Sequence, residues 1–381
     1  MIIIALKLKY VYTKGENIMP VKEKSFRIGC GRYLQECGII TSLGEEVLRL
    51  GTSPLIVGGK TALSITKTAA EKSVAQSCKK YEIIEHCGSC NHEDAQKLAL
   101  LSNEKSLDVI VGIGGGVIMD FAKLIGYYAK LPVINVPTSS ATCAAYTPLS
   151  VCYTPEGRTV GSQHYEYEVN AVIADTEIIA TQPNRLLLAG VFDALAKFVE
   201  IKQRFNEDCT DYPLGLDWAY VISKKSFDKL VNETEQCIVD MTNGDISDTV
   251  EQMIFTTIAV TGVISGIARG SNQTALAHKF YEATRALFFE ESKQYLHGEI
   301  VGVGLLLQNF FNGETSNNEF LLSLMKKYNM PCCLADIGIK NTETAKNMYF
   351  EKVKSSSAID ETNPDELKKF KEGLDYLWEL K

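Results

Sequence analysis

The sequence predicts an α/β domain with a parallel sheet, followed by an all-helical domain. Two observations predict this fold. Short β-branched runs alternate with amphipathic helical stretches up to about residue 180, and the strand pattern nearly disappears after that point. Strand runs separated by about 10–20 helical residues are typical of βαβ units. We therefore expect an α/β domain over residues 1–180 and an all-helical domain over residues 181–381.

Five apolar runs are predicted to be the strands of the sheet. They are residues 53–59, 80–88, 107–115, 131–138 and 170–176. These runs are apolar throughout, which suits strands that helices cover on both faces. Residues 1–18 precede a second methionine, Met19, and we expect them to be a peripheral extension.

Long helical patterns fill the second half of the chain. They cover residues 185–205, 249–268, 273–289, 299–311 and 318–328. The pair Asn363-Pro364 is a helix start signal, so we expect a final exposed helix after it.

Composition excludes several classes of protein. The chain has 381 residues and a net charge of -8, which argues against nucleic acid or an anionic membrane as the partner. No apolar run reaches the roughly 18 residues of a membrane span. Eleven cysteines, odd in number and irregularly spaced, do not form a recognisable disulfide framework. We expect a cytoplasmic protein that acts on a small molecule.

Three consecutive glycines, Gly114, Gly115 and Gly116, stand where a predicted strand runs into a predicted helix. Backbone N–H groups at such a turn can approach a pyrophosphate, and the helix N-terminus favours its negative charge. The alternative is a tight turn that binds nothing. Three glycines in a row cost stability, which favours a role in close approach to a ligand.

Asp193 stands inside an apolar helical pattern. Burying an unpaired carboxylate costs several kcal/mol, so it needs a partner or a metal. The alternative is a salt bridge to Lys197, one helical turn later. His278 lies in the middle of one predicted helix, and His297 opens the next apolar helix. One Asp and two His would form a three-ligand site with an open position, although each histidine alone could be a core residue.

Five motifs follow one another along the chain. They are GGG-x-x-x-D-x-x-K over 114–123, VPTSSATCAAYTPLSVCYT over 136–154, DALAK over 193–197, AH at 277–278 and HGE over 297–299. Together they resemble the glycerol dehydrogenase branch of the iron-containing alcohol dehydrogenase superfamily, from about residue 25 onward. The resemblance implies a dehydroquinate synthase-like architecture, an NAD(P)-dependent oxidoreductase and, in our expectation, a homo-oligomer. It makes residues 1–180 the nicotinamide-binding domain and residues 181–381 the metal-binding and catalytic domain.

The resemblance also implies the ligands of the metal and of the cofactor. One divalent metal would be held by Asp193, His278 and His297. We expect zinc more than iron, because iron-binding relatives add a histidine where this chain has Lys197. The cofactor would contact Gly114, Gly115, Gly116, Asp120, Lys123, Thr138, Ser139, Thr142, Thr147, Leu149 and Val151. Lys60 follows a predicted strand where an acid would bind the ribose of NAD, which favours NADP.

Two positions depart from the glycerol dehydrogenase pattern. Cys143 replaces an aspartate that contacts the polyol, and DALAK looks most like the hydroxycarboxylate dehydrogenases. A lysine beside the metal could bind the carboxylate of a substrate. We therefore predict a 2-oxo acid/2-hydroxy acid substrate at Cys143 and Lys197, with Asp193, His278, His297 and Lys197 as catalytic residues. Glycerol or another polyol is the alternative.

Two rival functions share the fold. One is a lyase like dehydroquinate synthase, which uses a glutamate where this chain has Asp193 and needs a basic cluster that is not evident near residues 270–300. The other is a non-catalytic nucleotide-binding protein, which the intact Asp193, His278 and His297 argue against.

Overall fold

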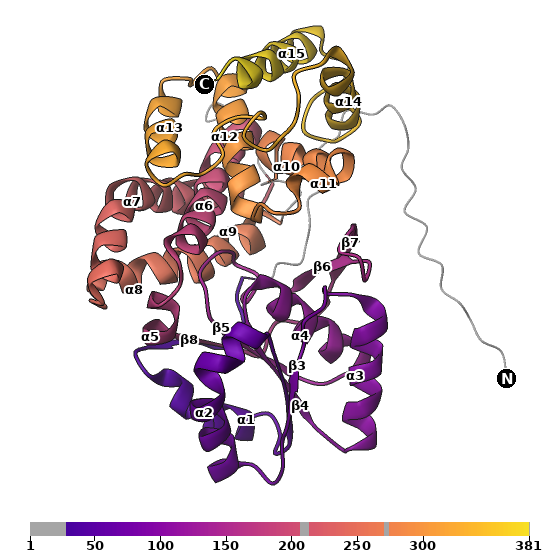
Figure 1. The fold of residues 1–381 in the computed structure, drawn as a ribbon, viewed down its shortest axis with the longest axis vertical. Coiled ribbons are helices and arrows are strands. Elements are labelled where there is room, and N and C mark those ends of the chain that lie inside the picture. The colour runs from indigo at the N-terminus through magenta and orange to yellow at the C-terminus, as the bar shows by residue number, and fades with distance from the viewer. Residues whose placement is uncertain (1–27, 206–212, 270–273, 381) are drawn as a thin grey trace, which may run out of the picture.

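The computed structural model describes residues 28–205, 213–269 and 274–380. The α/β part and the helical part stack along the long axis of the molecule (Figure 1). The proposed extension over residues 1–18 lies outside the described residues. The division into two domains at residue 180 stays a prediction, and it is supported by the position of the last strand at residues 171–175.

Six parallel strands form the central sheet in the order β1-β8-β5-β4-β2-β3. Their bounds are β1 (Tyr33–Glu36), β2 (Pro54–Gly58), β3 (Glu82–Glu85), β4 (Val109–Gly114), β5 (Val133–Pro137) and β8 (Ala171–Asp175). All five strands expected from sequence lie in this sheet, so the predicted parallel α/β class is confirmed. The strand β1 was not predicted, because it is short and only partly buried.

Helices cover both faces of the sheet. The first face packs against η1 (Ile39–Ser42), α1 (Leu43–Leu48) and α2 (Lys60–Ser77), and the second packs against α3 (His92–Glu104) and α4 (Gly116–Ala129). Along β4, Val109, Val111 and Ile113 belong to the first core, whereas Ile110 belongs to the second. This two-sided burial explains why the strands are apolar throughout.

An antiparallel hairpin also went unpredicted. It consists of β6 (Leu149–Tyr153) and β7 (Thr159–His164), and it projects from the α/β part beside the helical part (Figure 1). β7 is almost entirely exposed, so its sequence lacks the apolar run on which the strand predictions depended.

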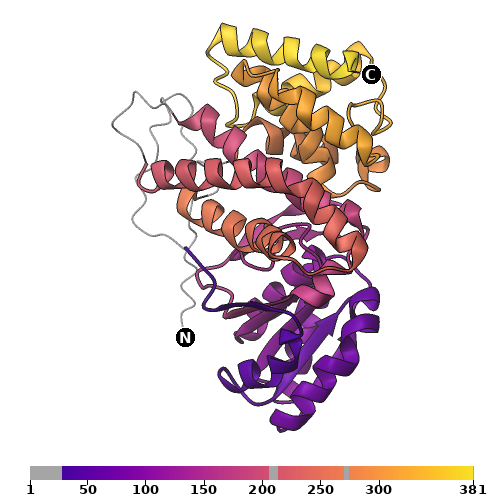
Figure 2. The same cartoon turned by 90° about the vertical axis from the view of Figure 1, so that its left-hand side faces the viewer.

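After β8, all the regular secondary structure of the described residues is helical (Figure 2). The helices are α5 (Thr176–Ala180), α6 (Asn184–Arg204), α7 (Leu216–Asn243), α8 (Asp248–Phe255), η2 (Thr256–Val260), α9 (Thr261–Ala268), α10 (Leu276–Leu287), α11 (Phe289–Ser292), α12 (His297–Asn312), α13 (Asn317–Lys327), α14 (Glu343–Lys354) and α15 (Pro364–Glu379). The central helix is α6, which packs against α7, α9, α10 and α12. Residues of α6 share one core with residues of α4 and β8, so the two parts are joined by continuous apolar packing.

Two expectations about composition can be compared with this structure. Within the described residues, the continuous stretch Asp248–Ala268 is long and apolar enough to cross a membrane, but 56% of its most apolar window is buried inside the protein. A core helix passes the same test, so this stretch is weak support for a span.

Every cysteine that the structure describes is a free thiol, as the irregular spacing predicts.

Candidate metal and nucleotide site

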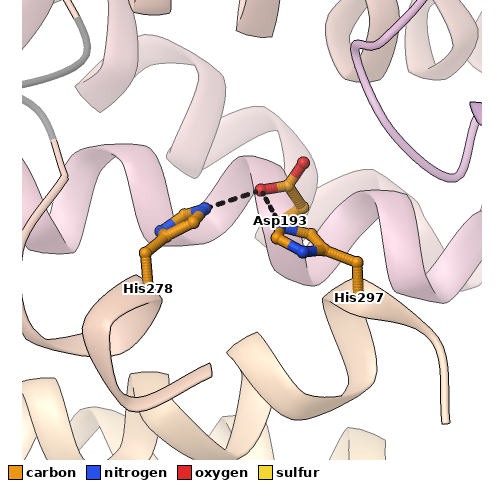
Figure 3. Close-up of side chains that lie close together, drawn as sticks. All are labelled: Asp193, His278 and His297. Atoms are coloured by element: carbon orange, nitrogen blue, oxygen red, sulfur yellow. Dashed lines mark hydrogen bonds and ion pairs between the residues drawn. The ribbon is translucent and has the colours of Figure 1, made fainter. Parts of the chain in front are cut away.

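Asp193, His278 and His297 come from three different helices and point toward one another (Figure 3). The Oδ1 atom of Asp193 lies 3.2 Å from Nε2 of His278 and 3.6 Å from Nε2 of His297. One potential ligand atom from each residue lies within 4.8 Å of the other two. The structure therefore brings together the three residues that the sequence analysis selected, with a carboxylate oxygen and two imidazole nitrogens as a donor set that suits zinc or iron(II).

Gly298, the second residue of α12, allows His297 to approach Asp193 on α6. A Cβ atom added to Gly298 would stand only 1.8 Å from the carbonyl oxygen of Ala189, which lies one turn before Asp193 on α6. Only glycine allows α12 to begin this close to α6. The glycine of the HGE motif is thus explained by packing, and this packing sets His297 beside the carboxylate.

The start of α12 is fixed by an ion pair between the buried carboxylate of Glu299 and the half-exposed Arg185, which the sequence analysis missed. Glu299 is 2% exposed, and its carboxylate accepts two hydrogen bonds from Arg185 at 2.6 and 2.7 Å. It also accepts from the backbone N–H of Leu296 at 2.7 Å, which caps the helix that begins with His297. Glu299 belongs to the HGE motif, but nothing in the sequence identified Arg185 as its partner.

Lys197 extends along α6 into the same cluster. Its Nζ lies 3.2 Å from Oδ1 of Asp193 and 3.4 Å from Nε2 of His278. Burial acts to raise the pKa of Asp193, but Lys197 and the two histidines outweigh it and hold that pKa well below its ordinary value. Asp193 is therefore ionised and available to a cation. The salt bridge that we considered as an alternative is present, together with the histidines.

The three glycines lie at the centre of the sheet edge. Gly114 ends β4, Gly115 precedes α4 and Gly116 begins it. Here the chain order reverses between β2 and β4, and such a switch point is where open α/β sheets bind ligands. A Cβ on Gly115 would meet only the Ser139 hydroxyl, at 3.7 Å, so the space above this residue is open. The turn fits a dinucleotide whose phosphates approach the backbone closely.

Lys60 lies across this switch point from the glycines. It is exposed and is the first residue of α2, directly after β2. The backbone N–H of Gly59 donates to the carbonyl of Ile113 at 3.3 Å, which joins the ends of β2 and β4. This placement suits the ribose end of a dinucleotide.

Five of the predicted cofactor residues form one buried network. Lys123 donates to the carbonyl groups of Ala144, Thr147 and Leu149, and it pairs with Asp120 at 2.8 Å. Asp120 accepts from the backbone N–H of Val151 at 3.0 Å. Asp120 and Lys123 are 6% and 2% exposed. In this structure they hold the segment 144–151, and their contact with the cofactor stays a prediction.

We expect Lys123→Met to destabilise the protein by about 3–5 kcal/mol, because it leaves Asp120 buried without its partner. Urea unfolding measures this loss, and Lys67→Met on the exposed face of α2 is the control. The double variant Asp120→Asn with Lys123→Met should recover part of the stability. Simple addition of the two single effects would contradict the predicted coupling.

The loop between β5 and β6 connects the glycine turn with α6. The backbone N–H of Ser140 donates to Oε1 of Gln182 at 2.9 Å, just before α6 begins. Thr138 donates through its N–H to Gly114 at 2.9 Å, and the Thr142 hydroxyl lies beside Gly116. Cys143, in the same loop, is within electrostatic reach of Lys197, and burial raises the pKa of its thiol to about 11. A neutral thiol therefore borders the cluster around Asp193.

Comparisons with known proteins agree with this geometry. Residues 30–176 match the family described as iron-containing alcohol dehydrogenase. The chain is 31% identical to a glycerol dehydrogenase from Thermotoga maritima, over 81% of this chain and 84% of that protein. It is 30% identical to hydroxycarboxylate dehydrogenase A from Escherichia coli, over 74% and 76%. A solved glycerol dehydrogenase from Schizosaccharomyces pombe has the same fold, with a TM-score of 0.79, 24% identity and coverage of 94% of this chain and 92% of that chain.

Proposed function

The chain belongs to the iron-containing alcohol dehydrogenase family, and we propose that it oxidises a small polyol reversibly, with one divalent metal on Asp193, His278 and His297. The convergence of these three side chains in the helical part is the observation that carries the proposal. Because its relatives are glycerol and alcohol dehydrogenases, the chain is an NAD(P)-dependent, metal-containing dehydrogenase. The lyase and the non-catalytic alternatives are therefore not proposed.

A 2-hydroxy acid remains a second candidate substrate. The sequence analysis preferred it, but glycerol dehydrogenases among the relatives give more support to the polyol. The observation in its favour is Lys197, whose side chain is 7% exposed and stands beside Asp193. With a divalent ion present, the positive charge of Lys197 and the metal would exceed the negative charge of Asp193 and the nearby Glu200. A substrate carboxylate would neutralise the excess.

The chain's own residues would have distinct roles in hydride transfer. When bound, the metal polarises the substrate C–O bond and the nicotinamide exchanges the hydride. Gly115 leaves room for the pyrophosphate, and the network of Lys123 holds the segment 144–151 in place. Asp193, His278 and His297 would hold the metal, while Lys197 and the neutral Cys143 border the substrate.

The identities of the metal and of the dinucleotide are also proposals. We propose zinc, because Lys197 stands where a further histidine would complete an iron site. We propose NADP, because the exposed Lys60 offers a cation to a 2'-phosphate. A homo-oligomer and a cytoplasmic location stay predictions. Kinetics with NAD and NADP, after reconstitution with zinc or iron(II), test the first two proposals.

A substrate panel with Lys197→Met tests the two candidate substrates. We expect the wild type to turn over glycerol and dihydroxyacetone faster than 2-oxobutyrate and its hydroxy acid. We expect the variant to lose activity equally on both classes, because Lys197 acts through its ion pair with Asp193. A selective loss of about 10–100-fold on the 2-oxo acid, equivalent to about 1.5–3 kcal/mol, would instead favour the second candidate.

A further inference from the structure

Glu200 lies two helical turns after Asp193 on α6, and it is completely buried. One carboxylate oxygen, Oε2, lies 2.6 Å from Nδ1 of His278. The other oxygen, Oε1, accepts hydrogen bonds from the backbone N–H groups of Ala275 and His278, each at 2.9 Å. A single side chain thus contacts both the ring and the backbone of His278.

The backbone contacts replace a missing helix cap. The residue before α10 is Ala275, which has no side-chain oxygen to accept from the first free N–H groups of the helix. Glu200 accepts from two of these groups, and Oε1 of Gln308 accepts from the other two, those of Leu276 at 2.8 Å and Ala277 at 3.3 Å. Two side chains from other helices therefore fix where α10 begins, and His278 is its third residue.

The ring contact determines which nitrogen of His278 carries the proton. An ionised carboxylate can only accept, so Nδ1 must donate to Glu200, and in the neutral ring Nε2 then carries the lone pair. The Nε2 atom faces Asp193, and it is 3.4 Å from the ammonium group of Lys197, which can only donate. Lys197 and Glu200 thus favour the Nδ1–H tautomer, whereas the ionised Asp193, 3.2 Å from Nε2, attracts a proton there until a metal ion between the two residues displaces it.

We propose that Glu200 is the positioning residue of the metal site: it caps α10 and holds His278 as the Nδ1–H tautomer, with Nε2 free to bind the ion. This inference rests on the proposed function, because it needs the metal to bind at Asp193, His278 and His297. Carboxylates that accept from the second nitrogen of a ligating histidine commonly improve metal affinity about 10–100-fold.

Glu200→Gln is the sharpest variant, because the amide has the shape of the carboxylate but only one accepting oxygen. If that oxygen remains with the backbone N–H groups, the amide NH₂ meets Nδ1 and moves the ring proton to Nε2. If the amide turns around, α10 loses its cap. In either arrangement His278 is no longer held ready for the metal.

Gln308→Met provides the matched control. Gln308 caps the same helix but does not contact the His278 ring. This variant should lower Tm and leave zinc affinity within about threefold of the wild type. Zinc dissociation constants would be measured by competition with a chromogenic chelator on the full-length apoprotein, for wild type, Glu200→Gln, Gln308→Met and Asp193→Asn.

We expect Glu200→Gln to bind zinc about 10–100-fold more weakly than the wild type. Equal zinc affinity in Glu200→Gln and wild type, with weak binding by Asp193→Asn, would overturn the role of Glu200 and leave the metal site standing. Zinc affinity of the wild type no better than that of Asp193→Asn would overturn the metal site itself, and the inference with it.

A second measurement does not depend on the folding of any Glu200 variant. Nitrogen-15 spectra of the zinc-loaded protein labelled at histidine report which nitrogen of each ring carries a proton, and the spectrum of His278→Asn identifies the signal of His278. We expect Nδ1 to be the protonated nitrogen in the wild type. A ring protonated at Nε2 would overturn the proposal.

Discussion

Asp193→Asn is expected to lose its bound metal and about 10³-fold or more of its kcat/KM, equivalent to about 4 kcal/mol. Asp193 is the carboxylate of the donor set, and its Oδ1 atom lies closest to both histidine rings. An amide removes the negative charge that attracts the cation, while Lys197 stays beside the site and repels it. The metal affinity should therefore fall far more than it would after the loss of one neutral ligand.

Elemental analysis after reconstitution with zinc measures occupancy directly. A chelator should lower the Tm of the wild type, because a ligand that binds only the folded state stabilises it, and the Tm of Asp193→Asn should not respond. His164→Ala on the exposed strand β7 is the control and should behave as the wild type. Full zinc occupancy in Asp193→Asn would mean that the metal, if present, is held elsewhere.

Gly115→Val is expected to weaken binding of the nicotinamide dinucleotide by about 100-fold or more, equivalent to about 2.7 kcal/mol. The backbone of Gly115 is extended, with a φ of -82°, so a branched side chain can adopt it. The new methyl groups would enter the open space above the turn, where the phosphates are expected to approach. The metal site should stay intact, because Gly115 lies on the α/β part and not among the three ligands.

Gly114→Ala gives the contrasting result. A Cβ at this position would stand 2.8 Å from a side-chain carbon of Ile118, inside the protein, so this variant should lower the free energy of unfolding. Gly115→Val should unfold at nearly the wild-type urea concentration. Dinucleotide titration by intrinsic fluorescence, together with urea unfolding, separates the two effects. Unchanged dinucleotide affinity in Gly115→Val would remove the phosphate role from this turn.

Features encoded locally were predictable from the sequence. The five buried strands were recognised because they are apolar throughout. The glycine turn was recognised because three consecutive glycines stand between a strand pattern and a helical pattern. Asp193 stood out because a carboxylate in an apolar helix needs a partner. The strands β1 and β7 were missed because neither is a buried apolar run.

The partners of the charged residues were decided only by the tertiary structure. Nothing in the sequence connects Arg185 with Glu299, which are 114 residues apart, or Glu200 with His278, which are 78 residues apart. Glu200 gave one signal, since it follows Asp193 on an apolar helix, but its partner begins a different helix. Periodicity and composition were enough to single out Asp193, because they show a carboxylate inside an apolar helix. They left His278 and His297 as candidates, and the ordered motifs that resemble a known family implied the complete ligand set. The carboxylate that orients a given histidine ring is determined by how the helices pack across the core. Glycines such as Gly298 set the separation of these helices, so the pairing exists only once the chain has folded.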